Sequence, residues 1–227
     1  MLEMTRLSSI IACACVVTVL DTASTQTPSL TAAAHKTSPP SELAPEIAAQ
    51  LSSEGVSASI SQPSVKIDFW WVKSLPIKAG AGAPSWTDVD EGSLIGAVRL
   101  SSEYRDIRGR VLKAGVYTLR YGIQPANGDH LGVSPFRDFL LLSPAAVDKD
   151  PAQHGHDGTV ELSKQAIGGS HPSVWSIDPP AATEVPLQHH KTELGHDAII
   201  MQVPVTRGGQ AAGTLKFGLV LIGKIEA

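Results

Sequence analysis

The chain has 227 residues, 42% of them hydrophobic and 18% charged, which suits one packed domain with accessory segments and excludes a globally disordered chain. Its formal charge is −4 and its basic residues are scattered, so we expect no nucleic-acid partner. The only two cysteines are Cys13 and Cys15. Once the N-terminal segment is removed, no disulfide, thiolate metal site or cysteine nucleophile is available.

Residues 1–24 predict a signal peptide. Arg6 precedes LSSIIACACVVTVL, an uncharged run with the length of a signal-peptide core. A membrane-spanning helix needs about 20 apolar residues, which is longer than this run. We therefore expect a periplasmic or secreted protein. An uncleaved anchor, or lipid attachment at Cys13 or Cys15, is the alternative and would be its only association with a membrane.

The next two segments lead into the main domain. Residues 25–40 are rich in Ser, Thr, Ala and Pro and predict a flexible linker. Residues 41–55 predict a short helix that is capped by Ser41 and ended by Gly55. The apolar stripe of this helix consists of Leu43, Ile47 and Leu51.

From residue 56 to residue 227 the apolar pattern changes to every second residue, which is typical of strands with one buried and one wetter face. Two less regular runs, FRDFLLLS and HPSVWSID, add further strands. The alternating apolar positions include Val65, Ile67, Phe69 and Trp71; Leu94, Val98 and Leu100; Tyr117, Leu119 and Tyr121; Ile199, Met201 and Val203; and Leu215, Phe217 and Leu219.

These elements predict an all-β fold, an antiparallel β-sandwich or jelly roll, with a short N-terminal helix. A second short helix is predicted at residues 159–167, with Thr159 as its cap and Gly168 as its end. Pro204 lies inside a strand pattern, which indicates a sheet edge or a bulge at that point.

The stretch YGIQPANGDHLGVSPFRDFLLLS predicts a strand, an extended loop and another strand. The loop covers residues 126–135 and carries Asp129 and His130. Loops often carry functional residues, so His130 is relevant if this loop folds toward the later histidines.

The histidines are unevenly distributed, because six of the eight lie between residues 154 and 196. Imidazole is the commonest metal ligand, and alternate residues of an extended segment point to one side. The sequence therefore suggests a copper or zinc site, or alternatively a solvated polar loop without metal; no HExxH or zinc-finger spacing is present. The candidate ligands are His130, His154, His156, His171 and His196, with His189 and His190 nearby.

Other residues suggest further hypotheses. DVDEG, at residues 88–92, is either a calcium-binding loop or an acidic surface loop. Trp70 lies on the face opposite Trp71, where it could stack on a sugar or be covered by the N-terminal helix. A glycosidase could use paired carboxylates, and no GxSxG motif is present. The candidate carboxylates are Asp68, Glu103, Asp138 and Asp148, and Arg99, Arg120 and Arg137 are expected to pair with carboxylates on the wet face of the sheet.

The segment LKAGVYTLRYGIQPANGDHLGVSPFRDFLLLSPAAVD resembles a group of exported bacterial proteins of unknown function. The similarity extends back through EGVSASISQPSVKIDFWWVKSLP and forward to HPSVWSI, over about residues 50–178. The resemblance implies an exported β-sandwich. It implies no activity, cofactor or catalytic residue.

The sequence thus favours a non-catalytic binding or interaction module outside the cytoplasm, with an unknown partner. The alternatives are a copper- or zinc-binding protein that uses the histidines, and a carbohydrate-active hydrolase that uses paired carboxylates. A fold class alone does not decide between them.

Overall fold

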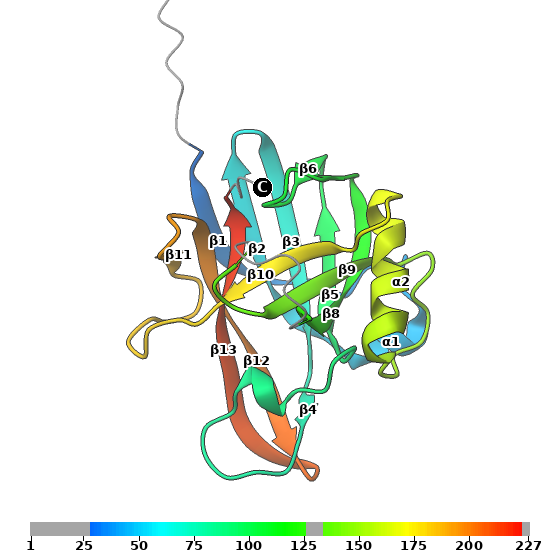
Figure 1. The fold of residues 1–227 in the computed structure, drawn as a ribbon, viewed down its shortest axis with the longest axis vertical. Helices are drawn as coiled ribbons and strands as arrows, with labels where there is room; N and C mark the ends of the chain where they lie inside the picture. Colours follow the sequence, from blue (N-terminus) through cyan, green and yellow to red (C-terminus); the bar gives the residue numbers. More distant parts are fainter. Residues whose placement is uncertain (1–27, 126–133, 224–227) are drawn as a thin grey trace, which may run out of the picture.

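The computed structural model describes residues 28–125 and 134–223 of the chain (Figure 1). The predicted signal peptide, both cysteines and His130 lie outside these residues. In chain order the elements are β1 (Leu30–Lys36), α1 (Pro45–Gln50), β2 (Leu51–Ser61), β3 (Ser64–Val72), β4 (Leu75–Ile77), the 3-10 helix η1 (Trp86–Asp88), β5 (Leu94–Leu100), β6 (Tyr104–Arg105), β7 (Val111–Leu112), β8 (Gly115–Ile123), β9 (Asp138–Pro144), α2 (Gly155–Ile167), β10 (Ser173–Asp178), β11 (His189–Lys191), β12 (Asp197–Arg207) and β13 (Gln210–Ile222).

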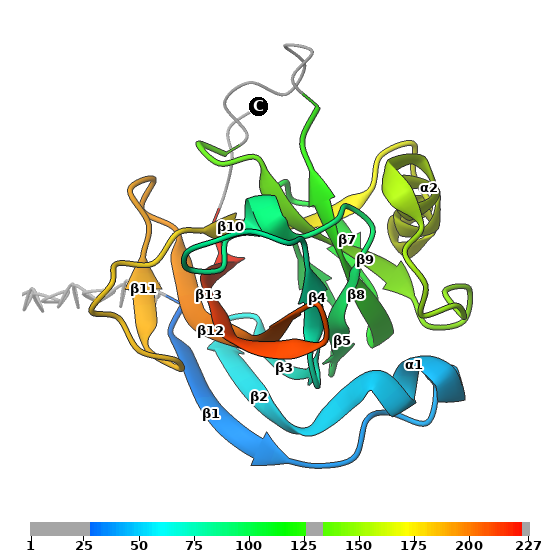
Figure 2. The same ribbon diagram turned by 90° about the horizontal axis from the view of Figure 1, so that it is seen from below.

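The strands form one long curled sheet, which confirms the all-β, sandwich-like fold. The strand order is β1-β2-β3-β5-β8-β9-β10-β13-β12-β11, and β6 and β7 form a separate pair. All neighbours in this order are antiparallel, whereas β4 joins β12 in parallel. The sheet curls until β12 contacts β1 and β3, as Figure 2 shows from below. The apolar core lies inside this curl.

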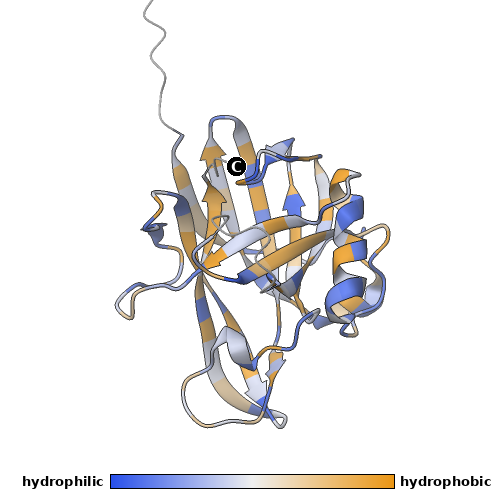
Figure 3. Ribbon diagram, viewed as in Figure 1, coloured by the Kyte–Doolittle hydropathy of each residue, from blue (hydrophilic) through white to orange (hydrophobic). Residues whose placement is uncertain are grey.

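Alternation of side chains explains the core. Phe69, Trp71, Leu119, Phe217 and their neighbours on the same strand faces are buried. Hydrophobic and hydrophilic bands follow each other along the strands in Figure 3. Aromatic rings link the strands across the core: Phe69 stacks on Trp71 with centroids 5.3 Å apart, and Trp71 meets Phe217 edge-on at 5.5 Å.

The N-terminal part differs from its prediction. Residues 30–36, expected in a flexible linker, form β1, which pairs along its whole length with β2. The helix is shorter than expected, because β2 already begins at Leu51 and runs through Gly55. The predicted stripe is nevertheless buried at Leu43, Ile47 and Leu51.

The second helix begins earlier than predicted, at Gly155, and ends where expected. Gly168 takes the left-handed conformation, with φ 63°, that commonly closes a helix. This helix, α2, packs on β9, β8 and β10, outside the curl of the sheet (Figure 1). No helix among the described residues is long and apolar enough to span a membrane.

The strand that contains Pro204 behaves as predicted. The pairing of β12 with β13 shifts register between Pro204 and Thr206, which is the signature of a bulge. Proline lacks the amide hydrogen that regular pairing uses, so the irregularity accommodates it.

One prediction about β8 is wrong. Arg120 was expected on a wet face, yet it is fully buried, as is Thr118 on the same face of the strand. The segment after β9 and the helix α2 cover this side of the sheet, so β8 has protein on both faces.

Candidate ligand-binding pocket

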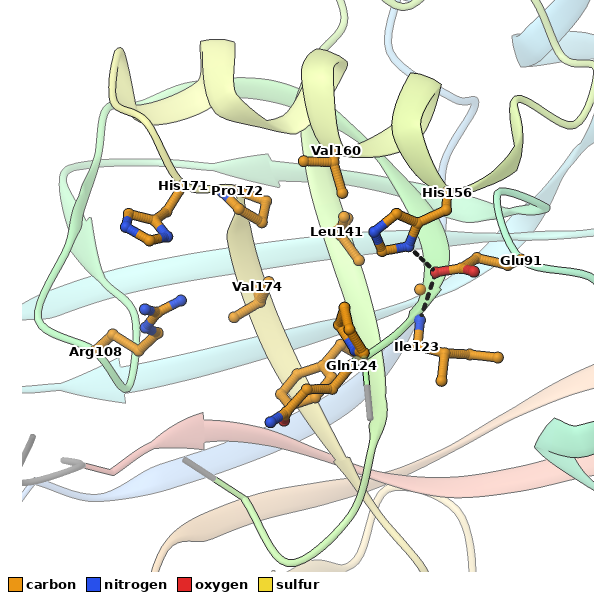
Figure 4. A pocket seen from close by; sticks show the side chains of 13 residues that line it. Glu91, Arg108, Ile123, Gln124, Leu141, His156, Val160, His171, Pro172 and Val174 are labelled. Atoms are coloured by element: carbon orange, nitrogen blue, oxygen red, sulfur yellow. Dashed lines mark hydrogen bonds and ion pairs between the residues drawn. The ribbon is translucent and has the colours of Figure 1, made fainter. Parts of the chain in front are cut away.

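A pocket of about 200 Å³ lies between α2 and the outer face of the sheet (Figure 4). Its floor comes from β8, β9 and β10, and its wall comes from α2 and the loop that follows it. The lining residues are Glu91, Arg108, Gly122, Ile123, Gln124, Pro125, Phe139, Leu141, His156, Val160, His171, Pro172 and Val174.

The floor is apolar because β9 carries large apolar residues on both of its faces. Leu140 and Leu142 point into the main core, whereas Phe139 and Leu141 form a second small cluster with Val174 of β10. Val160 of α2 packs against this second cluster from above. Within FRDFLLLS, the irregular apolar pattern is therefore the signature of a strand that is covered on both sides.

Glycine makes room for this floor. A Cβ at Gly122 would collide with the Leu141 side chain. Because glycine has none, Leu141 can lie across β8 at this point. The floor therefore depends on the absence of a side chain at Gly122 as well as on its apolar side chains.

A histidine–glutamate pair marks one end of the pocket. His156 Nδ1 lies 2.7 Å from Glu91 Oε1, which also accepts the Ile123 backbone N–H at 2.9 Å. An ionised carboxylate only accepts hydrogen bonds, so opposite it Nδ1 is the donor. In the neutral ring, Nε2 then remains as a hydrogen-bond acceptor. The pair resembles a general-base arrangement, but no Ser, Thr or Cys of the described residues lines the pocket.

Arg108 and His171 mark the other end, and the Arg108 guanidinium is directed toward His171 in Figure 4. Arg108 is half-buried, and this burial, with the charge of Arg110, lowers the pKa of its guanidinium. Arginine ion pairs within the described residues involve Arg99, Arg105, Arg120 and Arg207, and not Arg108.

The loop that carries Arg108 is fixed from below by a buried carboxylate. Asp106 Oδ1 accepts the backbone N–H groups of Arg108 and Arg110, each at 2.9 Å. Burial is the largest influence on Asp106 and raises its pKa. These two bonds hold the backbone of the loop while the Arg108 side chain faces the pocket.

A fully buried ion pair, Arg120–Asp148, supports the end of the pocket that carries His156 and Glu91. Arg120 donates to both Asp148 carboxylate oxygens, at 2.7 and 2.8 Å. It also donates to three carbonyl oxygens, those of Gly92 at 2.9 Å, Ala152 at 2.8 Å and Asp150 at 2.5 Å. Every nitrogen of this guanidinium is therefore used, as a buried charge requires.

This network determines where the histidine–glutamate pair sits. Gly92, with φ 83°, follows Glu91 and lies so close to Gly155 that a Cβ would come within 2.6 Å of the Gly155 nitrogen. Gly155 in turn precedes His156. Since Arg120 binds the carbonyl of Gly92 and that of Ala152 just before α2, it fixes both backbone segments that carry the pair.

Asp148 remains charged in this environment. Burial alone would raise the pKa of Asp148, but the hydrogen bonds from Arg120 and Thr118 and the charge of Arg120 outweigh burial and lower it. His154 Nε2 lies 3.5 Å from Asp148 Oδ1. His154 is thus part of the surroundings of this ion pair.

The remaining histidines have separate partners. His189 Nε2 lies 2.8 Å from Asp197, and His190 lies between Glu184 at 2.6 Å and Asp178 at 3.0 Å. His196 lies beside Gly223.

The predicted metal ligands therefore do not converge within the described part of the chain. In residues 28–125 and 134–223, no group of three or more His, Cys, Asp or Glu side chains could hold a metal ion. His156 and His171 share the pocket but lie at its opposite ends (Figure 4). His154 faces Asp148. Each imidazole lies near a different group because strands and loops from distant parts of the sequence separate them.

The acidic DVDEG loop does not gather its carboxylates either. Asp88 pairs with Arg207 at 2.9 Å, Asp90 with Lys78 at 3.2 Å and Glu91 with His156. Three carboxylates with three different partners do not form a calcium site.

Trp70 is covered, by a different element from the one expected. Only 4% of it is exposed, and its indole N–H donates to the Thr37 carbonyl at 3.0 Å. His35 of β1 meets the ring edge-on with centroids 5.1 Å apart. The ring is thus not available for stacking on a sugar.

The candidate carboxylates bind different partners, and none of them lines the pocket. Glu91 is the only carboxylate among the described residues that line the pocket, and it was considered only as part of DVDEG. Asp68 binds Ser57 and Lys66, Asp138 binds the Tyr121 hydroxyl, and Glu103 pairs with Arg105. Of the three arginines, Arg99 pairs with Glu42, Arg137 donates to the Gln124 carbonyl, and Arg120 is buried rather than on a wet face.

Comparison with known proteins gives no matching family model, no matching curated protein and no matching solved structure. A function has to be argued from the pocket itself.

Proposed function

We propose that this chain is a non-catalytic binding module that takes up a small, largely apolar molecule in the pocket beneath α2. The observation that carries the proposal is the second apolar cluster of Phe139, Leu141, Val174 and Val160, which borders an open space of about 200 Å³. Concave apolar surfaces with a few polar groups are the usual form of small-molecule sites.

The N-terminal sequence supports a place outside the cytoplasm for this activity, since an uncharged run follows Arg6 as in a signal peptide. The two alternatives have less support. Copper or zinc binding needs converging ligands, which the described residues do not provide. Glycoside hydrolysis needs two carboxylates in the site, and Glu91 is the one carboxylate among the described lining residues.

The experiment uses N-phenyl-1-naphthylamine, a neutral probe whose fluorescence rises in apolar surroundings. We expect the full-length protein, processed as it is in the cell, to bind the probe. Val160→Phe and Val174→Phe place a ring in the pocket and should each weaken binding about tenfold or more, which corresponds to about 1.4 kcal/mol.

Val185→Phe is the matched control, because Val185 is 59% exposed and does not line the pocket. It should bind the probe like the wild type. The proposal fails if the wild type does not bind the probe, or if both pocket variants bind it unchanged.

A further inference from the structure

We infer that the ligand is a small amphipathic carboxylate, bound with its carboxylate at Arg108 and with a remote hydroxyl at His156. This inference rests on the proposed function and specifies the ligand class of the same pocket. It follows from the unequal chemistry of the two ends of the pocket, with an apolar floor between them.

The arginine end fits an anion. Arg108 is half-buried and lines the same pocket as Phe139 and Val174, and it forms no ion pair with any described carboxylate. A guanidinium presents two parallel N–H groups that match the two oxygens of a carboxylate. An anion at this position would offset the cost of having withdrawn the Arg108 charge from water.

The number of charges at the pocket favours a monoanion over a phosphate dianion. Arg108 is the only arginine or lysine among the described lining residues. Buried Asp106 lies under the same loop, and Glu91 lies at the other end, so a second negative charge on the ligand would meet two carboxylates. An amine is disfavoured at Arg108 because like charges repel.

The middle of the ligand is expected to be mainly apolar. Leu141, Val160 and Val174 lie between the two ends in Figure 4, and Gln124 is the one polar lining side chain of the described residues that is drawn below them. A hydrocarbon chain or ring would cover these side chains and remove their surface from water, which is worth about 25 cal/mol per Å².

The His156 end of the pocket favours a ligand group that donates a hydrogen bond. Because Glu91 occupies Nδ1 of His156, the neutral ring offers its Nε2 as an acceptor. A ligand hydroxyl can donate to Nε2, whereas a second carboxylate would face Glu91. A hydroxy acid with the hydroxyl remote from the carboxylate satisfies both ends.

The test displaces the neutral probe from the full-length protein with octanoate, octanol, octylamine and 8-hydroxyoctanoate, with shorter and longer homologues to set the chain length. We expect octanoate to displace the probe at a concentration at least tenfold lower than octanol or octylamine does. The hydroxy acid should improve on octanoate by severalfold.

Arg108→Gln should abolish the preference for octanoate over octanol, with the affinity of each variant for the probe measured first so that displacement is compared on one scale. Arg110→Gln is the matched control, because Arg110 belongs to the same loop and does not line the pocket. His156→Phe should remove only the advantage of 8-hydroxyoctanoate over octanoate and keep the preference for octanoate over octanol. Thermal unfolding of each variant verifies that it is folded.

The outcomes separate the two proposals. If the probe binds and octanoate, octanol and octylamine compete equally, the ligand class is wrong and the proposed function stands. Equal loss of the preference in Arg108→Gln and Arg110→Gln would also overturn the assignment. If the wild type does not bind the probe, the proposed function itself fails.

Discussion

Arg120 illustrates how one residue can connect the core to a site that it does not touch. Its guanidinium is fully buried and serves Asp148 and three backbone carbonyls. Removing one partner of such a pair leaves an uncompensated charge, which costs far more than the pair itself contributes. The network therefore stabilises the pocket wall only while it is complete.

Asp148→Asn tests this dependence. The substitution leaves Arg120 buried without a counter-charge, so we expect a loss of about 3–5 kcal/mol in the free energy of unfolding. Urea unfolding measures it. Glu193→Gln, at an exposed site, should change the stability by less than about 0.5 kcal/mol. Similar losses in both variants would contradict the role assigned to the ion pair.

At the scale of elements, the end of α2 is set by Gly168. With φ 63° it adopts a backbone conformation that a Cβ disfavours. We expect Gly168→Ala to lower the free energy of unfolding by about 1 kcal/mol, seen as a lower urea midpoint with unchanged slope. Gly80→Ala should have no such cost, since Gly80 lacks a positive φ and no atom lies within 4 Å of its Cβ position.

The sequence predicted most elements because large apolar residues alternate along the strands. It predicted the bulge at Pro204 and the end of α2 at Gly168 for reasons of backbone chemistry. It missed β1, LTAAAHK, since small alanines give no apolar alternation and the strand forms through pairing with β2. Such pairing is a tertiary property that local composition does not encode.

The pocket could be predicted only in pieces. His156 was a candidate as a metal ligand and Glu91 lay within DVDEG, but 65 positions separate them in the chain. Arg108 lies in a short loop whose sequence contains no motif that indicates a binding site. What unites these residues is the pairing of β8, β9 and β10 and the packing of α2, and neither can be derived from spacing.

On the scale of the whole molecule, stability should depend on pH in two directions. Burial lowers the pKa of His190, but the hydrogen bonds that its ring donates to Glu184 and Asp178 outweigh burial and raise the pKa above 6.5. The contribution of His190 is therefore fully present below pH 6.5 and is lost as pH rises through the raised value. The pKa values of Asp148 and Glu184 are lowered. The contributions of these carboxylates to stability are therefore fully present above pH 3.8 and pH 4.5 respectively, and they are lost as pH falls.

We expect the melting temperature to be highest between about pH 4.5 and 6.5 and to fall on either side. His190→Gln should flatten the decline on the alkaline side, because the residue that loses its proton is gone. His189→Gln, with a half-exposed ring, should keep the wild-type decline. Thermal unfolding across this range checks both, and equal slopes in the wild type and His190→Gln would contradict the assignment.

The curl of the sheet also has a kinetic consequence. Strand β12, near the end of the described chain, contacts β1 at its beginning. The two can meet only after the ends of a long intervening chain have come together, and such loop closure lowers the rate of folding rather than the final stability. Until the C-terminal hairpin of β12 and β13 docks, Trp71 lacks its contact with Phe217 and this part of the apolar core stays open. A chain in which β12 and β13 have not yet docked is therefore the species with the greatest tendency to aggregate.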